Sequence, residues 1–202
     1  MTAYKFTYFN AKALGESIRM LFHYGGVEFV DDRVNFEDWP KIKPSTPFGQ
    51  LPVLEVDGKK VVQSSAIARY LAKKFGLAGK DDWEALQIDS TVETIHDLRT
   101  KIAAHYYENN AESKAEKLKI AKEMVPFYVN KLDEQVKKNG GYFVGGKLSW
   151  AEFVFVGLLE YLNYTQGCDI IAKAENLKAL RDTVLAIPSI KTWVAKRPKT
   201  EF

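Results

Sequence analysis

Two polar residues stand where the sequence predicts that a strand passes directly into a helix. Gln63 and Ser64 follow a predicted strand over residues 59–62 and precede a helical pattern through Ala66 and Leu71. The first backbone amides of a helix have no intrahelical partner, so they attract an anion. Ser64 is therefore a candidate ligand of a carboxylate or phosphate, with the Gln63 amide beside it. An ordinary serine N-cap would give the same pattern.

Leu51 and Pro52 directly precede another predicted strand. Proline is the residue before which a cis peptide bond costs little free energy. A cis bond here would turn the amide and carbonyl of Leu51 outward, where an extended peptide could pair with them. The alternative is a proline that only initiates a strand.

Tyr8 lies near the carboxyl end of the first predicted strand. Open α/β sheets bind ligands at this edge. A phenol placed there can donate a hydrogen bond to a nearby anion, which makes Tyr8 a candidate catalytic residue. Packing in the core is the alternative role.

A row of acidic residues follows one face of a predicted helix in the middle of the chain. Asp89, Glu93 and Asp97 are spaced by four, and Lys101 follows four residues later. A surface ion pair of this kind contributes about 0.3–0.5 kcal/mol. Asp97 could instead face a cation from a ligand or from a second subunit. Glu93, His96 and Asp97 could also hold a divalent metal between subunits, although we expect no metal because spacing alone defines no binding geometry.

The elements that would position these residues begin with a β-α-β unit. Residues 4–9 read as a strand, and a helix follows from about Gly15 to a stop at Gly25 and Gly26. Residues 27–33 read as a second strand. This order implies a parallel pair of strands joined by a right-handed crossover.

The next segment predicts an irregular loop and a hairpin. Residues 39–52 contain too many prolines and glycines for a long helix. Asp57 and Gly58 separate predicted strands at residues 53–56 and 59–62, which is a strong hairpin signal. We therefore expect one mixed sheet in the first part of the chain.

Beyond residue 80 the predicted elements are all helices. Ser149 and Glu152 have the spacing of a capping box, which marks the start of one helix. We place the boundary between the two parts in residues 76–82, which gives domains over residues 1–79 and 81–202. The predicted helices cover residues 83–107, residues 113–138, a segment that opens at Ser149, and residues near 177–185 and 189–195.

Composition and charge narrow the class of protein. The 202 residues carry a net charge of +3, and acidic residues separate the lysine pairs, a pattern that does not favour a nucleic-acid binder. The longest apolar run covers residues 153–159, whereas a membrane helix needs about 18 or more apolar residues. The first residues lack a signal-peptide pattern, and Cys168 is the sole cysteine, which rules out an intramolecular disulfide. We expect a cytoplasmic protein that binds no membrane.

The ordered set of motifs resembles the cytosolic glutathione S-transferases, and most of all the sigma class with its insect members. Each motif alone is common, but their order over the whole chain is specific. The matching segments are residues 4–9, 38–40, 43–45, 47–58, 63–64, 66–71, Asp97 and residues 195–198.

The resemblance implies the fold, the co-substrate and the partners. It implies an α/β thioredoxin-like N-terminal domain that binds glutathione and an all-α C-terminal domain that holds an electrophile slot. It also implies a homodimer that acts on small hydrophobic electrophiles, with glutathione as co-substrate.

The resemblance assigns parts of glutathione to the residues found above. The γ-glutamyl carboxylate would bind at Ser64, the ammonium would face Asp97 of the other subunit, and the cysteinyl backbone would pair with Leu51. The glycyl carboxylate would meet Lys43 and Trp39. The full set of implied glutathione-binding residues is Tyr8, Trp39, Lys43, Gly49, Gln50, Leu51, Pro52, Gln63, Ser64 and Asp97.

The implied chemistry is addition of the glutathione thiolate to an electrophile, with Tyr8 as the catalytic residue. Lowering a thiol pKa by roughly two units needs about 2.7 kcal/mol of preferential thiolate stabilisation. One charge-assisted hydrogen bond contributes about 1.5–3 kcal/mol, so the Tyr8 hydroxyl could supply most of it. The candidates for lining the electrophile slot are Phe9, Leu14, Ile102, Tyr106 and Phe202.

The sequence departs from the prostaglandin-isomerising members of the class. Those relatives carry an arginine where this chain has Leu14, and a tryptophan near the place of Ala104 and His105. His96 replaces one of their metal-interface acids. These differences favour general conjugation, including conjugation of lipid-peroxidation aldehydes, over prostaglandin isomerisation.

Three alternatives stay open from the sequence. One is a glutathione-dependent prostaglandin isomerase, and another is a non-catalytic ligand-binding or crystallin-like relative. The third is a thiol oxidoreductase of the thioredoxin type, which the absence of cysteine from the first 80 residues disfavours.

Overall fold

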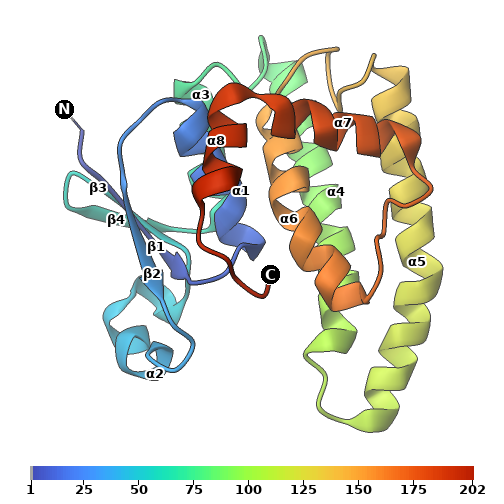
Figure 1. Ribbon diagram of the computed structural model, residues 1–202, viewed down its shortest axis with the longest axis horizontal. Coiled ribbons are helices and arrows are strands. Elements are labelled where there is room, and N and C mark those ends of the chain that lie inside the picture. Colours follow the sequence, from blue (N-terminus) through green and yellow to red (C-terminus); the bar gives the residue numbers. More distant parts are fainter. Residues whose placement is uncertain (1) are drawn as a thin grey trace.

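The computed structural model describes residues 2–202 and divides them between a sheet with its covering helices and a bundle of longer helices (Figure 1). The strands are β1 (Tyr4–Phe9), β2 (Val30–Val34), β3 (Val53–Val56) and β4 (Lys59–Val62). The helices are α1 (Ala13–Tyr24), α2 (Trp39–Ile42), α3 (Ser64–Lys74), α4 (Asp82–Tyr106), α5 (Ala111–Lys138), α6 (Trp150–Gln166), α7 (Glu175–Ala186) and α8 (Pro188–Lys196). Two 3₁₀ turns, η1 (Lys43–Ser45) and η2 (Pro47–Gly49), follow α2.

The sheet is mixed, as predicted, with strand order β2-β1-β3-β4. β1 runs parallel to β2 and antiparallel to β3, and β3 and β4 form the predicted hairpin. Asp57 and Gly58 turn this hairpin with φ of +48° and +81°, a conformation that asparagine, aspartate and glycine tolerate best. The hydrophobic and turn signals were therefore sufficient to predict the parallel pair and the hairpin, but they did not give the strand order.

The start of β2 was predicted wrongly. The strand begins at Val30, three residues later than expected, because the preceding residues complete the end of α1. The Val27 amide donates to the Phe22 carbonyl at 3.2 Å, and the Phe29 ring stacks on the Phe22 ring at 4.3 Å. Val27 and Phe29 are apolar because they pack on α1. A run of apolar residues looks the same in the sequence whether it forms a strand or a loop packed on a helix.

The predicted capping box at the start of α6 is confirmed. The Ser149 hydroxyl accepts from the first turn of α6, and the Glu152 carboxylate accepts from the Ser149 amide at 2.7 Å. Glu152 is fully buried and also accepts from the Phe143 amide at 2.8 Å. Burial raises the pKa of Glu152, while these hydrogen bonds act against that rise. The cap thus ties the loop after α5 to the buried helix α6.

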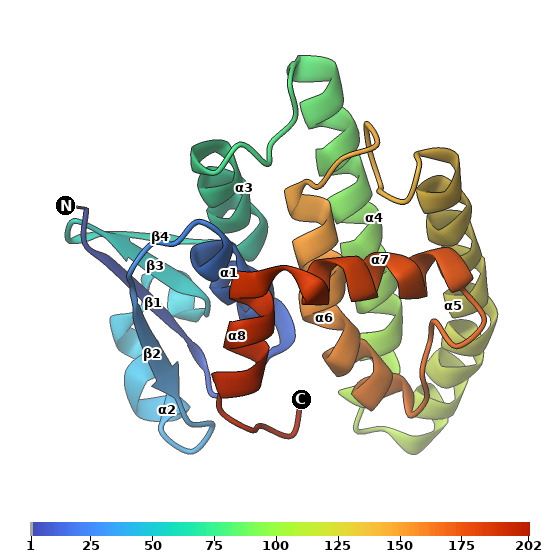
Figure 2. The same ribbon diagram turned by 45° about the horizontal axis from the view of Figure 1, so that its top comes forward.

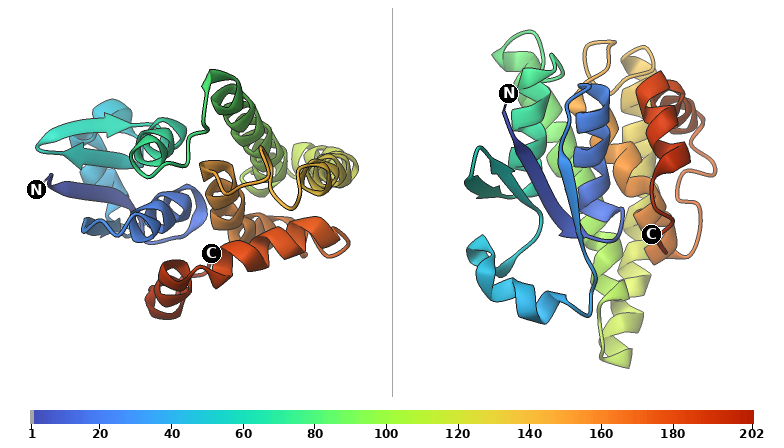
Figure 3. Two further views of the ribbon diagram at one scale, coloured as in Figure 1. Left: turned by 90° about the horizontal axis from the view of Figure 1, so that it is seen from above. Right: turned by 60° about the vertical axis from the view of Figure 1, so that its left-hand side comes forward.

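Helices α1 and α6 form the main contact between the sheet and the helical bundle (Figures 2 and 3). Gly157 of α6 faces the backbone of α1, where a Cβ atom at position 157 would lie 2.6 Å from the Ser17 nitrogen. Nearby, the Tyr24 and Phe153 rings meet edge to face at 5.2 Å. The absence of a side chain at Gly157 therefore sets how closely the two parts of the molecule approach.

None of the helices in residues 2–202 combines the length and the apolar character that crossing a bilayer requires.

Replacement of Gly157 by valine tests this contact. The added side chain must push α1 and α6 apart, so we expect Gly157→Val to lower the free energy of unfolding by about 1–3 kcal/mol. Urea denaturation followed by circular dichroism measures the change. Thr183→Val on the exposed face of α7 is the control, with an expected change within about 0.5 kcal/mol. An unfolding midpoint equal to that of the wild type in Gly157→Val would contradict the close packing.

Candidate active site

The Tyr8 side chain is 6% exposed and lies against α1. A Cβ atom at Gly15 would come within 3.0 Å of three Tyr8 ring atoms, so the ring occupies the space that a side chain would need. The Phe6 ring stacks on the Tyr8 ring at 6.2 Å, and the Phe9 ring meets it at 5.6 Å. β1 therefore supplies the phenol, and a glycine in α1 leaves room for it.

Arg19 of α1 organises the loop that follows Tyr8, and its side chain has no exposed surface. It donates to the carbonyls of Ala11 at 2.6 Å and Phe9 at 3.2 Å, and to the Asp31 carboxylate at 2.9 Å. Its guanidinium also lies 5.7 Å from the centre of the Tyr8 ring. Arg19 was not predicted as a site residue, although an arginine among the apolar residues of α1 is a visible signal in the sequence.

The Tyr8 phenol is neutral at physiological pH. Burial raises the pKa of Tyr8 to about 12, although a hydrogen bond with the Leu14 backbone and the positive charge of Arg19 act in the opposite direction. A neutral phenol can donate a hydrogen bond to an anion but cannot act as a base. The geometry therefore suits stabilisation of a negative charge.

The segment between β2 and β3 carries several of the predicted binding residues and packs against the end of β1 at Trp39. The Trp39 ring lies 5.3 Å from the Phe9 ring. A Cβ at Gly49 would lie 3.3 Å from Cε of Lys43, so the lysine stem covers this glycine. The Leu51-Pro52 peptide bond is cis.

The start of α3 differs from an ordinary serine cap. Gln63 occupies the N-cap position with φ of +77°, and neither it nor Ser64 caps the helix with a side-chain hydrogen bond. Ser64 is instead the first helical residue. The alternative that Ser64 only caps the helix is therefore wrong. The strained Gln63 backbone is of the kind found at binding sites.

Asp97 is exposed on α4, and the alternative in which it pairs with Lys101 is not what the structure shows. Among residues 2–202 it forms no ion pair with Lys101, whereas Asp89 pairs with Arg69 of α3 at 2.9 Å. Glu93, His96 and Asp97 do not form a metal-binding cluster in this described part of the chain.

The slot residues predicted from the sequence are only partly accessible. Phe9, Leu14, Tyr106 and Phe202 are partly exposed, but Ile102 has no exposed surface. Ile102 is therefore a core residue of α4, and its assignment to an open slot is corrected. Helical periodicity predicted that the Ile102 side chain faces inward, but it could not show whether that side chain lies in the core or lines a cleft.

Further aromatic residues near Tyr8 were missed by the sequence analysis. The Phe202 ring packs on Tyr161 at 5.4 Å and on Tyr164 at 5.1 Å. The Tyr161 hydroxyl donates a hydrogen bond to the Tyr107 hydroxyl at 3.4 Å. Tyr107 raises the pKa of Tyr8, and Tyr8 in turn raises the pKa of Tyr161. The signal that could have identified them was the spacing of Tyr161 and Tyr164, three residues apart in an otherwise apolar helix.

Comparisons with known proteins cover nearly the whole chain. Residues 4–73 match the family described as "Glutathione S-transferase, N-terminal domain", and residues 96–197 match "Glutathione S-transferase, C-terminal domain". A "Glutathione S-transferase" of Anopheles gambiae is 48% identical over 202 residues, which is 100% of both chains.

Solved structures give the same result. A structure titled "prostaglandin synthase D of Nilaparvata lugens" has a TM-score of 0.94 and 48% identity, and covers 98% of this chain and 100% of its own. The monomeric Na-GST-3 of the hookworm Necator americanus has a TM-score of 0.83 and 34% identity, with 99% and 100% coverage.

These matches confirm the predicted fold class, a thioredoxin-like α/β part with an all-α part. On the identity and the extent of the matches, the chain belongs to the glutathione S-transferase family.

Proposed function

We propose that the protein is a glutathione transferase of the sigma class, which conjugates the glutathione thiolate to hydrophobic electrophiles. The buried Tyr8 phenol near the end of β1 is the observation that carries the proposal, because a hydrogen-bond donor held there against α1 suits a thiolate. Membership of the family supports the same activity. Tyr8 is the proposed catalytic residue.

Glutathione binding is assigned to the segment between β2 and α3. The γ-glutamyl carboxylate binds at the first amides of α3, next to Ser64 and Gln63, where the helix dipole favours a negative charge. The cysteinyl backbone pairs with the backbone of Leu51. Trp39 and Lys43 bind the glycyl carboxylate, and the other proposed contacts come from Gly49, Gln50 and Pro52.

The reaction needs the thiolate and a place for its electrophile. The glutathione thiol releases its proton to solvent, and the Tyr8 hydroxyl donates a hydrogen bond to the resulting sulfur anion, which stabilises the thiolate over the thiol. The thiolate then forms a bond to the electrophile, which either expels a leaving group with its electron pair or, for an unsaturated aldehyde, takes up a proton from water. The proposed slot is lined by Phe9, Leu14, Tyr106 and Phe202. These side chains hold an apolar electrophile close to the sulfur, which raises the rate without activating the electrophile.

A second candidate activity is glutathione-dependent prostaglandin isomerisation. A 48% identical structure bears the name of a prostaglandin synthase, which favours it. Leu14 gives no positive charge to an oxygenated substrate, so general conjugation, including that of lipid-peroxidation aldehydes, remains the main proposal. An assay with prostaglandin H as substrate separates the two.

We propose a homodimer in the cytoplasm, with the two domains at residues 1–79 and 81–202. Asp97 is exposed, and in a dimer it would face the glutathione ammonium bound to the partner subunit. Phe48 is 86% exposed on η2, and such an apolar side chain is more stable when a second subunit covers it.

Tyr8→Phe tests the catalytic assignment. Loss of one charge-assisted hydrogen bond should lower kcat by about 10- to 100-fold, whereas glutathione affinity should change less than about twofold. Conjugation of 1-chloro-2,4-dinitrobenzene and calorimetry with glutathione measure the two quantities. Tyr128→Phe on α5 is the control. Wild-type rates in Tyr8→Phe would refute the assignment, and the absence of conjugation in the wild type would favour a non-catalytic relative.

Gly15→Ala tests the position of the Tyr8 ring. The added methyl group displaces the ring, so we expect a loss of kcat of about the same size as in Tyr8→Phe. The double variant should lose no more than either single variant, because both changes remove one interaction. Gly25→Ala is the matched control, since its Cβ would overlap the Phe75 ring instead. Additive losses in the double variant would contradict the account.

Asp97→Asn tests the contact across the proposed dimer. Removing the charge should raise the KM for glutathione by about tenfold, since a charge-assisted hydrogen bond is lost, and should change kcat little. Glu93→Gln, one helical turn away, should leave both constants unchanged. An unchanged KM in a variant shown to be dimeric by sedimentation would exclude this role of Asp97.

A further inference from the structure

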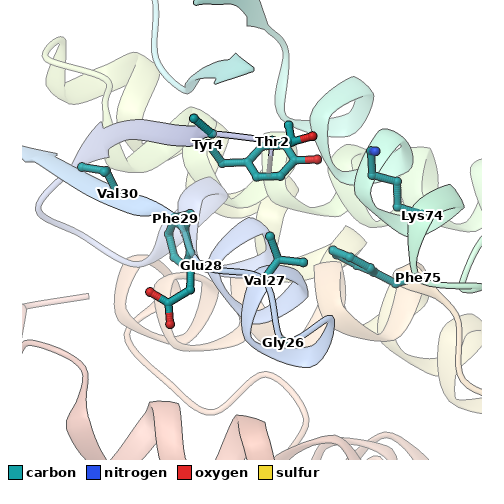
Figure 4. A pocket seen from close by; sticks show the side chains of 10 residues that line it. Thr2, Tyr4, Gly26, Val27, Glu28, Phe29, Val30, Lys74 and Phe75 are labelled. Atoms are coloured by element: carbon teal, nitrogen blue, oxygen red, sulfur yellow. The ribbon is translucent and has the colours of Figure 1, made fainter. Parts of the chain in front are cut away.

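A second pocket lies at the start of β1, at the opposite end of the strand from Tyr8 (Figure 4). It is open to solvent and has a volume of about 800 Å³, within the 300–1,000 Å³ range that is common for small-molecule sites. We call it the β1-start pocket and define it by Thr2, Tyr4, Val27, Phe29, Lys74 and Phe75. None of these six residues is among the proposed catalytic, glutathione-binding or slot residues.

The polar and apolar groups of the pocket are separated. Figure 4 shows the hydroxyls of Thr2 and Tyr4 on the side of the Lys74 ammonium, with Val27 and Phe75 beneath them. Phe29 extends the apolar floor. This arrangement suits a ligand with a polar end and an apolar body.

Lys74 makes the polar end of the pocket positive. Among residues 2–202 it has no carboxylate partner, whereas its neighbours are the phenols of Tyr4 and Tyr70. Hydrogen bonds with these phenols raise the pKa of Lys74, and its ammonium lies 5.2 Å from the centre of the Tyr70 ring. The lysine is therefore charged at neutral pH.

Two acidic residues around the pocket, Asp57 and Glu28, do not pair with this ammonium. The Asp57 carboxylate accepts from the Ala3 amide at 2.8 Å. Figure 4 shows the Glu28 carboxylate on the far side of the pocket from Lys74. Burial raises the pKa of Tyr4, so its phenol stays a neutral donor beside the ammonium. An anionic oxygen group suits this end of the pocket, because it can accept from both donors and balance the lysine charge.

We propose that the β1-start pocket binds an amphipathic carboxylate. The carboxylate lies between Lys74 and the Tyr4 hydroxyl, and the apolar body rests on Val27, Phe29 and Phe75. Tyr4 and Tyr8 are four residues apart on β1, a span of about 13 Å at roughly 3.3 Å per residue. The pocket and the proposed active site are therefore separate places on the molecule.

A matched pair of ligands tests the proposal. 1-Naphthaleneacetate and 1-naphthaleneacetamide share one ring system and differ in charge. We expect the acid to bind the wild-type protein about tenfold more tightly than the amide, which is the effect of a charge-assisted contact. Calorimetry measures both affinities with saturating S-hexylglutathione present, so that the proposed active site is occupied.

Variants locate the binding. Lys74→Gln should remove the preference for the acid, Lys74→Arg should keep it, and Lys73→Gln should also keep it as the adjacent control. Backbone amide resonances of residues 26–30 should shift on addition of the acid. Equal affinities for the two ligands in the wild type would overturn the proposal, as would loss of the preference in Lys73→Gln.

Competition separates this site from the proposed function. Displacement of the acid by S-hexylglutathione would place it in the active site and would overturn the inference. If S-hexylglutathione itself fails to bind, the proposed function is wrong. The preference for the acid in the wild type and its loss in Lys74→Gln would still show whether the β1-start pocket binds a carboxylate.

Discussion

The position of one phenol depends on two features of α1 that face it. Gly15 leaves the space that the Tyr8 ring fills, and Arg19 holds the loop beyond it through the carbonyls of Phe9 and Ala11. Arg19 is itself kept in the core by its ion pair with Asp31. Removing one partner of such a buried pair costs about 3–5 kcal/mol, so this arrangement is expensive to disturb. A neutral, immobile hydroxyl is what the proposed thiolate chemistry requires.

The helical part of the chain completes the surroundings of that phenol. The Lys12 amide donates to the Phe202 carbonyl at 2.8 Å, and the Lys12 ammonium pairs with Glu160 of α6 at 2.8 Å. Arg197 pairs with Glu16 of α1 at 2.7 Å and also with Glu160. These contacts fasten the end of the chain to the start of α1. The proposed electrophile slot is therefore built by segments that lie nearly 200 residues apart in the sequence.

Local signals in the sequence predicted the local structure well, and tertiary signals were harder to find. The hairpin at Asp57 and the capping box at Ser149 are short-range interactions, so a few residues determine them. Gly15, Arg19 and the burial of Ile102 depend on what packs against them, which spacing along one helix does not show. The proposed glutathione contacts came from a family resemblance, whereas the burial of Tyr8 and the packing of its ring against Gly15 required the three-dimensional structure.

The central claim is that Tyr8 stabilises the thiolate of bound glutathione. The ultraviolet absorbance of the thiolate, recorded against pH for the wild-type complex, measures the pKa of the bound thiol directly. We expect a value about two units below the ordinary thiol pKa of about 8.5, which matches the stabilisation that one charge-assisted hydrogen bond provides. A bound thiol that titrates at its ordinary pKa would contradict it.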